Sequence, residues 1–278
     1  MNLSIKPLHF TKAGVWEEDR SLAETTELLA EAGFRHLDLM LTEREETEKI
    51  AEHLQKIGTV VIQSHIPFNR YKKNDYSVYK KTVMQCAENA RILGSKILVV
   101  HGDEFDFANM TYTPEAALEF NYKFFYDVVD FAEKNGMRVA FECLFQERNR
   151  DPEKEPRFCS YVEDLCNLTD KFGTDTVGIC WDTGHSKLQY GDEQFKKLEY
   201  AGKRVIATHI HDNYYDRDLH TFPFIGDINW QAVIRTLRKI EYKGDFNFEL
   251  AYARLPSDMA LDYLKLLYKA GQYIINEL

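Results

Sequence analysis

The stretches RVAFEC at residues 138–143 and VGICWDTGH at residues 177–185 decide the fold class of this chain. Both are continuous runs of apolar and β-branched residues, without the alternation of apolar and polar positions seen in a half-exposed strand. Such runs are typical of strands that are buried on both faces, as in a parallel sheet. Each run carries an acidic residue near its end, which is where parallel barrels place their active-site residues.

The same pattern recurs along the chain. Strands are predicted at residues 5–8, 36–40, 59–65, 96–101, 138–143, 177–182, 204–211 and 246–251, with helical periodicity between them. Capping signals at Ser21, Thr113 and Ser160 mark predicted helix starts. No linker interrupts the alternation, and neither GxGxxG nor GxxxxGK[ST] occurs, which disfavours an open doubly wound sheet, the runner-up. The sequence therefore predicts a single (β/α)8 TIM barrel domain of the α/β class over residues 1–278.

Composition disfavours several classes of function. The net charge of −10 is unsuited to binding nucleic acid or an anionic membrane. No apolar run approaches the ~20 residues of a membrane span, and the segment MNLSIKPLHF has no signal-peptide pattern. The five cysteines form no CxxC motif, as expected for free thiols. We therefore expect a cytoplasmic protein without membrane partners.

Potential metal ligands lie at the ends of successive predicted strands. Four of them, one from each of four strands, are Glu142, Asp182, His209 and Glu249. In a barrel these side chains converge on the axis. Because buried carboxylates cost several kcal/mol unless they are paired or bound to a metal, a metal site is the natural explanation of the group. Carboxylates with one imidazole suit a single Mn, Mg, Co or Zn ion.

Further histidines and acidic residues extend this group. Gly184 in the DTGH segment predicts a tight turn that brings Asp182 and His185 to the same mouth. His211 shares a strand face with His209, although one strand position usually supplies one ligand, and Asp212 is placed to orient an imidazole. The additional candidate metal or substrate ligands are His65, His101, His211, Asp218 and His220.

The segments HIPF, VVHG, FEC, WDTGH, HIHDN, FPFIGDINW and FELAY together resemble the xylose-isomerase-like TIM barrels. That superfamily includes sugar and sugar-phosphate isomerases and epimerases, inosose-processing enzymes, and apurinic endonucleases of the endonuclease IV type. The resemblance implies that Glu142, Asp182, His209 and Glu249 hold one catalytic divalent metal. It also implies that Glu142 and Glu249 exchange the substrate proton, while His185 binds a substrate hydroxyl or positions Glu142.

The resemblance thus predicts an enzyme of carbohydrate metabolism. We expect a metal-dependent isomerase or epimerase of a small keto-sugar, keto-polyol or sugar phosphate, acting through a metal-stabilised enediolate. A keto-sugar lyase or dehydratase would share the first step, and the motifs leave the exact substrate and its phosphorylation open. Phe68 and Phe222, near the predicted barrel mouth, are candidates for stacking on the sugar. Such barrels often form dimers or tetramers, so a homo-oligomer is compatible with the sequence.

A three-zinc phosphodiesterase is the alternative. The further zinc ligands of the endonuclease members match His65, His101, His185, Asp218 and His220, so up to three Zn ions are conceivable here. Against this alternative, the CLFQERN and GDINW segments differ from the endonuclease pattern, and GDINW looks like the sugar-enzyme form. The net charge of −10 is also poor for a DNA-binding protein, so nucleic acid is a disfavoured partner. A non-catalytic sugar-binding barrel would be expected to lack one of the four core ligands, and all four are present.

Overall fold

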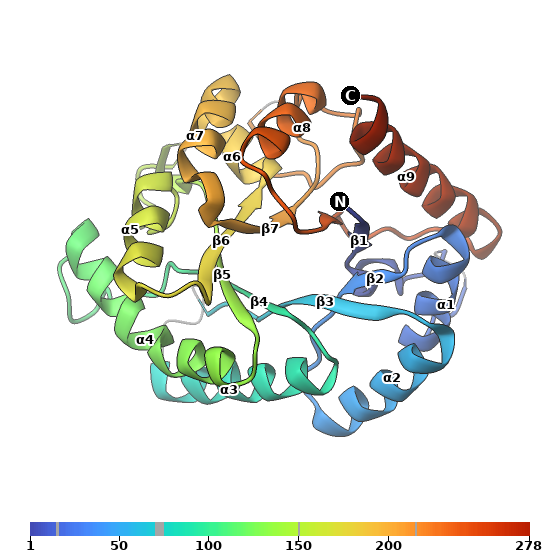
Figure 1. Ribbon diagram of the computed structural model, residues 1–278, viewed down its shortest axis with the longest axis horizontal. Helices are drawn as coiled ribbons and strands as arrows, with labels where there is room; N and C mark the ends of the chain where they lie inside the picture. Colours follow the sequence, from blue (N-terminus) through green and yellow to red (C-terminus); the bar gives the residue numbers. More distant parts are fainter. Residues whose placement is uncertain (15–16, 70–74, 150, 215) are drawn as a thin grey trace.

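The computed structural model describes residues 1–14, 17–69, 75–149, 151–214 and 216–278. Eight parallel strands surround a common axis, and helices form an outer ring around them (Figure 1). The strands are β1 (Leu3–Ile5), β2 (His36–Asp38), β3 (Val60–His65), β4 (Ile97–Val100), β5 (Arg138–Glu142), β6 (Val177–Asp182), β7 (Val205–His209) and β8 (Phe246–Phe248). From β1 to β7 each strand pairs with the next along the chain, and β1 also pairs with β8. The predicted (β/α)8 TIM barrel is confirmed.

The barrel closes between β7 and β8. Ile210 N donates a hydrogen bond to Asn247 O at 2.7 Å, and Glu249 N donates to Ile210 O at 3.1 Å. Ile210 and Phe248 also form a parallel bridge. Because these bonds lie directly beyond His209 and beside Glu249, the closure brings these two side chains next to each other.

The helices that connect the strands begin largely where their capping signals lie. They are α1 (Leu22–Ala32), α2 (Arg44–Ile57), α3 (Tyr76–Ile92), α4 (Pro114–Lys134), α5 (Val162–Phe172), α6 (Thr183–Tyr190), α7 (Gln194–Ala201), α8 (Trp230–Lys239) and α9 (Ser257–Glu277). Ser21 and Glu24 form the predicted capping box of α1, and the Thr113 side chain caps α4. Among the described residues, no helix combines the length and the apolar character that crossing a membrane requires.

Several boundaries differ from the sequence prediction, and two of these differences concern a proline and a helix cap. β1 ends at Ile5, because Pro7 lacks an N–H and starts a short 3-10 helix over Pro7–Phe10. The residue before α5 is Tyr161, and no side chain caps that helix, so the predicted cap at Ser160 is wrong.

The inside of the barrel changes from apolar to polar along its axis. A small apolar cluster consists of Val99, Ala140, Cys180, Ile206 and Ala207. Side chains two residues apart on a strand face the same side. Glu142 lies two residues beyond Ala140, and His209 lies two residues beyond Ala207. Both side chains therefore enter the barrel at the carboxyl ends of the strands, and both are buried.

Candidate metal centre

Glu142 is the centre of the polar cluster in the barrel. Its side chain, at the end of β5, is 2% exposed. Its Oε2 atom lies 2.8 Å from His65 Nε2 and 3.3 Å from His101 Nε2. Its Oε1 atom lies 3.2 Å from His185 Nδ1 and 3.3 Å from His209 Nδ1. Four imidazoles therefore surround one carboxylate. They come from β3, the residue after β4, α6 and β7.

Three carboxylates converge on His209, the last residue of β7. His209 Nδ1 lies 2.6 Å from Glu249 Oε2, 3.3 Å from Glu142 Oε1 and 4.0 Å from Asp182 Oδ2. These four residues each offer one possible ligand atom, and the four atoms all lie within 4.8 Å of one another. Both ring nitrogens of His209 and Glu249 Oε2 are buried without a well-formed hydrogen bond in the described part of the chain. A divalent cation would satisfy these atoms and offset the repulsion among the carboxylates, and oxygens with one imidazole nitrogen are a suitable ligand set.

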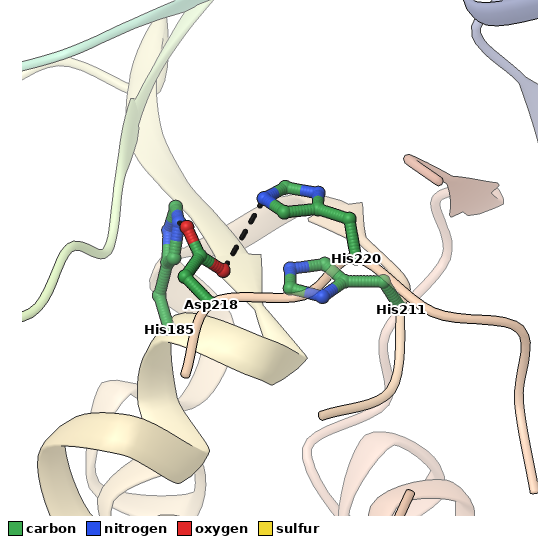
Figure 2. Close-up of side chains that lie close together, drawn as sticks. All are labelled: His185, His211, Asp218 and His220. Atoms are coloured by element: carbon green, nitrogen blue, oxygen red, sulfur yellow. Dashed lines mark ion pairs between the residues drawn. The ribbon is translucent and has the colours of Figure 1, made fainter. Parts of the chain in front are cut away.

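A second group of possible ligands lies beside this one, at the start of α6 and after β7 (Figure 2). Asp218 lies between two imidazoles, with Oδ2 3.4 Å from His185 Nε2 and Oδ1 3.3 Å from His220 Nε2. The rings of His211 and His220 stack with their centroids 3.7 Å apart. His211 Nε2 lies 3.0 Å from Asp182 Oδ1, so Asp182 links the two groups.

The structure thus brings together the four predicted core ligands and the additional candidates. The two aromatic side chains predicted to line the substrate pocket, Phe68 and Phe222, have different surroundings. Phe68 stacks on His101 with ring centroids 4.3 Å apart, and therefore lies beside the cluster. Phe222 packs edge-on against Tyr263 of α9, with centroids 5.7 Å apart. The geometry therefore supports Phe68 more directly than Phe222 as a wall of the site.

The DTGH segment does not form the tight turn that its glycine predicts. Asp182 is the N-cap of α6, and its Oδ1 accepts a hydrogen bond from His185 N at 2.6 Å. Gly184 lies inside α6, and a Cβ atom there would fall 1.9 Å from Cε1 of His211. Glycine is needed at this position because the His211 ring occupies the space of a side chain.

Replacing Gly184 with alanine is expected to destabilise the protein by about 1–3 kcal/mol, because the added methyl group must displace the His211 ring. The higher helix propensity of alanine offsets part of this loss of stability. Urea unfolding of Gly184→Ala would measure it. Removing the ring as well, in a Gly184→Ala/His211→Ala double variant, should cost less than the sum of the single substitutions. Full additivity, or a Gly184→Ala variant as stable as the parent, would contradict this account.

Asp212 binds loop groups and does not orient an imidazole, so the role predicted for this residue is wrong. Its carboxylate accepts hydrogen bonds from Phe224 N at 2.9 Å, Ile228 N at 3.2 Å and Trp230 Nε1 at 3.1 Å. These hydrogen bonds hold together the two ends of the connection between β7 and α8. The same segment carries Asp218, so Asp212 supports the second group through the backbone.

Two charged residues of the site escaped the sequence analysis. Lys6 Nζ lies 2.6 Å from Glu249 Oε1, with the two side chains 15% and 11% exposed. Asp38 ends β2, and its Oδ2 lies 3.5 Å from His209 Nε2. Both residues occur within apolar strand segments, SIKPL and HLDLM. A charged residue within or at the end of an apolar strand segment is the signal that pointed to Glu142, and the same signal could have identified these two.

The surroundings keep the acidic groups ionised. Burial opposes the charged form of Glu142, but His209 and His101 outweigh burial and hold the pKa of Glu142 well below its usual range. Burial likewise opposes ionisation of Asp38, yet Lys6 and His209 lower its pKa to about 2. The carboxyl end of the barrel therefore concentrates negative charge, which a divalent cation would balance.

The histidines differ in their protonation in the metal-free protein. Burial, followed by the charge of Lys6, lowers the pKa of His65 to about 4, so this imidazole is neutral at pH 7, as a ligand must be. Burial also disfavours the charged form of His220, but Asp218 outweighs burial and raises the pKa of His220 to about 9. Imidazolium ions thus balance part of the negative charge when no metal is bound.

The metal-free protein is expected to lose stability as the pH rises from about 6.5 to about 9. His220 has a raised pKa in the folded state, so its contribution is complete below its ordinary pKa of 6.5 and is lost through pH 9. Because a divalent ion replaces bound protons, adding metal should raise the melting temperature more at pH 9 than at pH 6.5. Thermal melts of chelated and metal-loaded protein at both values would measure the difference, with His220→Gln as the less pH-dependent control. A chelated protein that melts higher at pH 9 would rule this out.

Comparisons with known proteins agree with the fold. Residues 26–270 match the model of the xylose isomerase-like TIM barrel family, and the chain belongs to this family. It is 24% identical over 263 residues to the uncharacterized protein y4fM of Sinorhizobium fredii, which covers 83% of this chain and 81% of that protein.

Two solved structures illustrate the similarity. A D-tagatose 3-epimerase-like protein has a TM-score of 0.75 at 22% identity, covering 100% of this chain and 99% of that chain. The IolI protein with a binding zinc atom has a TM-score of 0.74 at 14% identity, with 100% and 99% coverage. At these identities the two structures establish the shared barrel.

Proposed function

We propose that this protein is a divalent-metal-dependent isomerase or epimerase of a small keto-sugar, keto-polyol or sugar phosphate. The observation that carries the proposal is the convergence of Glu142, Asp182 and Glu249 on Nδ1 of His209. These four residues would hold one Mn, Mg, Co or Zn ion. The family membership, and the similarity to a protein named as D-tagatose 3-epimerase-like, support a carbohydrate substrate.

A divalent ion at this point would supply Lewis acidity to the substrate oxygens and stabilise an enediolate. The protein's own carboxylates would move the proton. In our proposal, Glu142 and Glu249 act as the pair: one takes the proton next to the carbonyl, and the other returns it to the neighbouring carbon or the opposite face. Burial opposes ionisation of Glu249, but His209 and Lys6 outweigh it and keep the pKa of Glu249 well below its usual range, in the form that accepts a proton.

Neighbouring residues would orient these groups and the substrate. His185 Nδ1 lies 3.2 Å from Glu142 Oε1, which suits a role in positioning Glu142 or in binding a substrate hydroxyl. Phe68 is 41% exposed and stacks on His101, so the exposed part of its ring lies where it could pack against the carbon side of a sugar. Phe222 is the second candidate for the pocket wall.

A three-zinc phosphodiesterase is the second candidate function. One observation favours it: the described residues form three groups that could each hold an ion. Glu142 belongs to two of these groups, and its Oε2 faces His65 and His101 while its Oε1 faces His209, so this carboxylate would help to hold more than one ion. Clustered metals stabilise the attacking and leaving oxygens in phosphodiester cleavage.

Metal analysis followed by an exchange screen would test the proposal. Elemental mass spectrometry of protein purified without chelators is expected to find about one divalent ion per chain. Incubation in D2O with ketoses, keto-polyols and their phosphates should then incorporate deuterium next to a carbonyl, and the product would distinguish an isomerase or epimerase from a lyase or dehydratase. Three zinc ions per chain with cleavage of abasic DNA would instead support the phosphodiesterase. A metal-loaded protein that exchanges no proton of these compounds would contradict the main proposal.

A further inference from the structure

Asp38 is a buried carboxylate that is held from several strands. It ends β2 and is 2% exposed. Its Oδ1 accepts a hydrogen bond from His65 N at 3.1 Å. Its Oδ2 accepts from Gln63 Nε2 at 3.0 Å and from Asn247 Nδ2 at 3.1 Å. Ser4 Oγ in turn donates to Asn247 Oδ1 at 2.9 Å, so β1, β2, β3 and β8 all contribute to fixing this carboxylate.

His209 lies between Asp38 and the acidic cluster. Asp38 Oδ2 is 3.5 Å from His209 Nε2, on one side of the ring. On the other side, His209 Nδ1 faces Glu249 Oε2 at 2.6 Å and Glu142 Oε1 at 3.3 Å. The ring is fully buried, so no solvent competes for either nitrogen. One carboxylate therefore faces Nε2, and the proposed ligand carboxylates face Nδ1.

The position of the proton on a neutral imidazole decides which nitrogen can bind a cation. If the proton is on Nε2, it lies on the side of the ring that faces the fixed Asp38 carboxylate, and the Nδ1 lone pair lies on the side that faces the proposed metal position. The other tautomer would direct a lone pair at Asp38 and remove the ligand. A carboxylate behind a metal-binding histidine orients the ring and increases its basicity.

We propose that Asp38 is a positioning residue that holds His209 in the tautomer with its proton on Nε2, so that Nδ1 is the metal-binding nitrogen. The inference rests on the metal site of the proposed function and not on its reaction. It also explains an acidic residue inside HLDLM, a segment that otherwise forms a buried strand and its apolar continuation. Asp38 thus acts on the metal through His209 and not by direct contact.

The first test is the metal affinity of an Asp38→Asn variant, measured by competition with a chromogenic chelator and without any substrate. The apparent dissociation constant for Zn2+ is expected to rise about 10- to 100-fold. The matched control is Asp245→Asn. Asp245 Oδ2 lies 2.5 Å from His36 Nδ1, at the amino end of β2, and forms a carboxylate–imidazole pair of the same kind away from the cluster. This control should bind Zn2+ as the parent does.

The second test does not depend on an Asp38 variant. In the Zn2+-loaded parent labelled with 15N-histidine, the His209 ring should show a protonated Nε2 and a metal-bound Nδ1, with His209→Gln used to assign the signals. The inference would be overturned if zinc were bound to Nε2, if the proton were on Nδ1, or if the Asp38→Asn variant had the affinity of the parent.

The outcomes also separate this inference from the proposed function. A parent that binds no divalent ion would overturn both. A parent that binds metal through Nδ1 but exchanges no sugar proton would remove only the proposed reaction, and would support the role of Asp38.

Discussion

The Glu142→Gln variant is expected to lose solvent-deuterium exchange into the keto-substrate by about 10²- to 10⁴-fold, the usual contribution of a general acid or base. The side chain is buried among His65, His101, His185 and His209, and no other carboxylate contacts that many imidazoles in the described structure. Glutamine keeps the shape but can neither accept a proton nor balance the charge of a metal. NMR detection of deuterium incorporation would measure the loss.

The metal content of the variant would separate two causes of this loss. A Glu142→Gln protein that keeps its ion has lost the base, whereas one that has lost its ion has lost a ligand. Glu104→Gln is a matched control, because Glu104 is also buried but its Oε1 accepts from Asn69 N at 3.1 Å. Burial and the neighbouring Asp103 raise the pKa of Glu104 to about 8, so glutamine resembles its protonated form at pH 7. Exchange at the parent rate in Glu142→Gln would eliminate Glu142 as the base.

Removing the divalent ion with a chelator is expected to reduce the exchange to background and to lower the melting temperature. Without a cation, the carboxylates of Glu142, Asp182 and Glu249 converge on His209, and only Lys6 and protonated imidazoles balance their charge. An ion present at a thousand times its dissociation constant stabilises the folded state by about 4 kcal/mol. Deuterium exchange and thermal melts, before and after chelation, would measure both effects.

Adding ions back provides the control for chelation. Exchange and melting temperature should return together when Mn, Co, Mg or Zn is restored, and the equivalents needed would count the ions that the reaction requires. The experiment should be repeated with His209→Ala, in which restoration is expected to fail because the only nitrogen among the four core ligands is gone. A protein shown to be metal-free that still exchanges at the parent rate would exclude a metal-dependent reaction.

The sequence pattern was most informative where one physical constraint dominated. Strands such as β5 and β6 are buried on both faces, so their apolar runs predict them without knowledge of their partners. The capping box of α1 and the strand-end carboxylates are likewise local signals. Prediction was wrong where a tertiary contact decided the outcome. Gly184 is required by the ring of His211, and Asp212 is bound by amides that lie 12 and 16 residues further along the same loop.

The sequence by itself determined the parallel barrel and most of the candidate ligands at its carboxyl end, because hydrophobic periodicity and strand ends are local properties of the chain. Only the tertiary structure decided how those side chains are grouped. Lys6 meets Glu249 because β1 pairs with β8, and Asp38 meets His209 across the interior. Distances between strands far apart in the chain depend on how the barrel closes, and that closure determines which ring nitrogen of His209 faces the carboxylates of the proposed metal site.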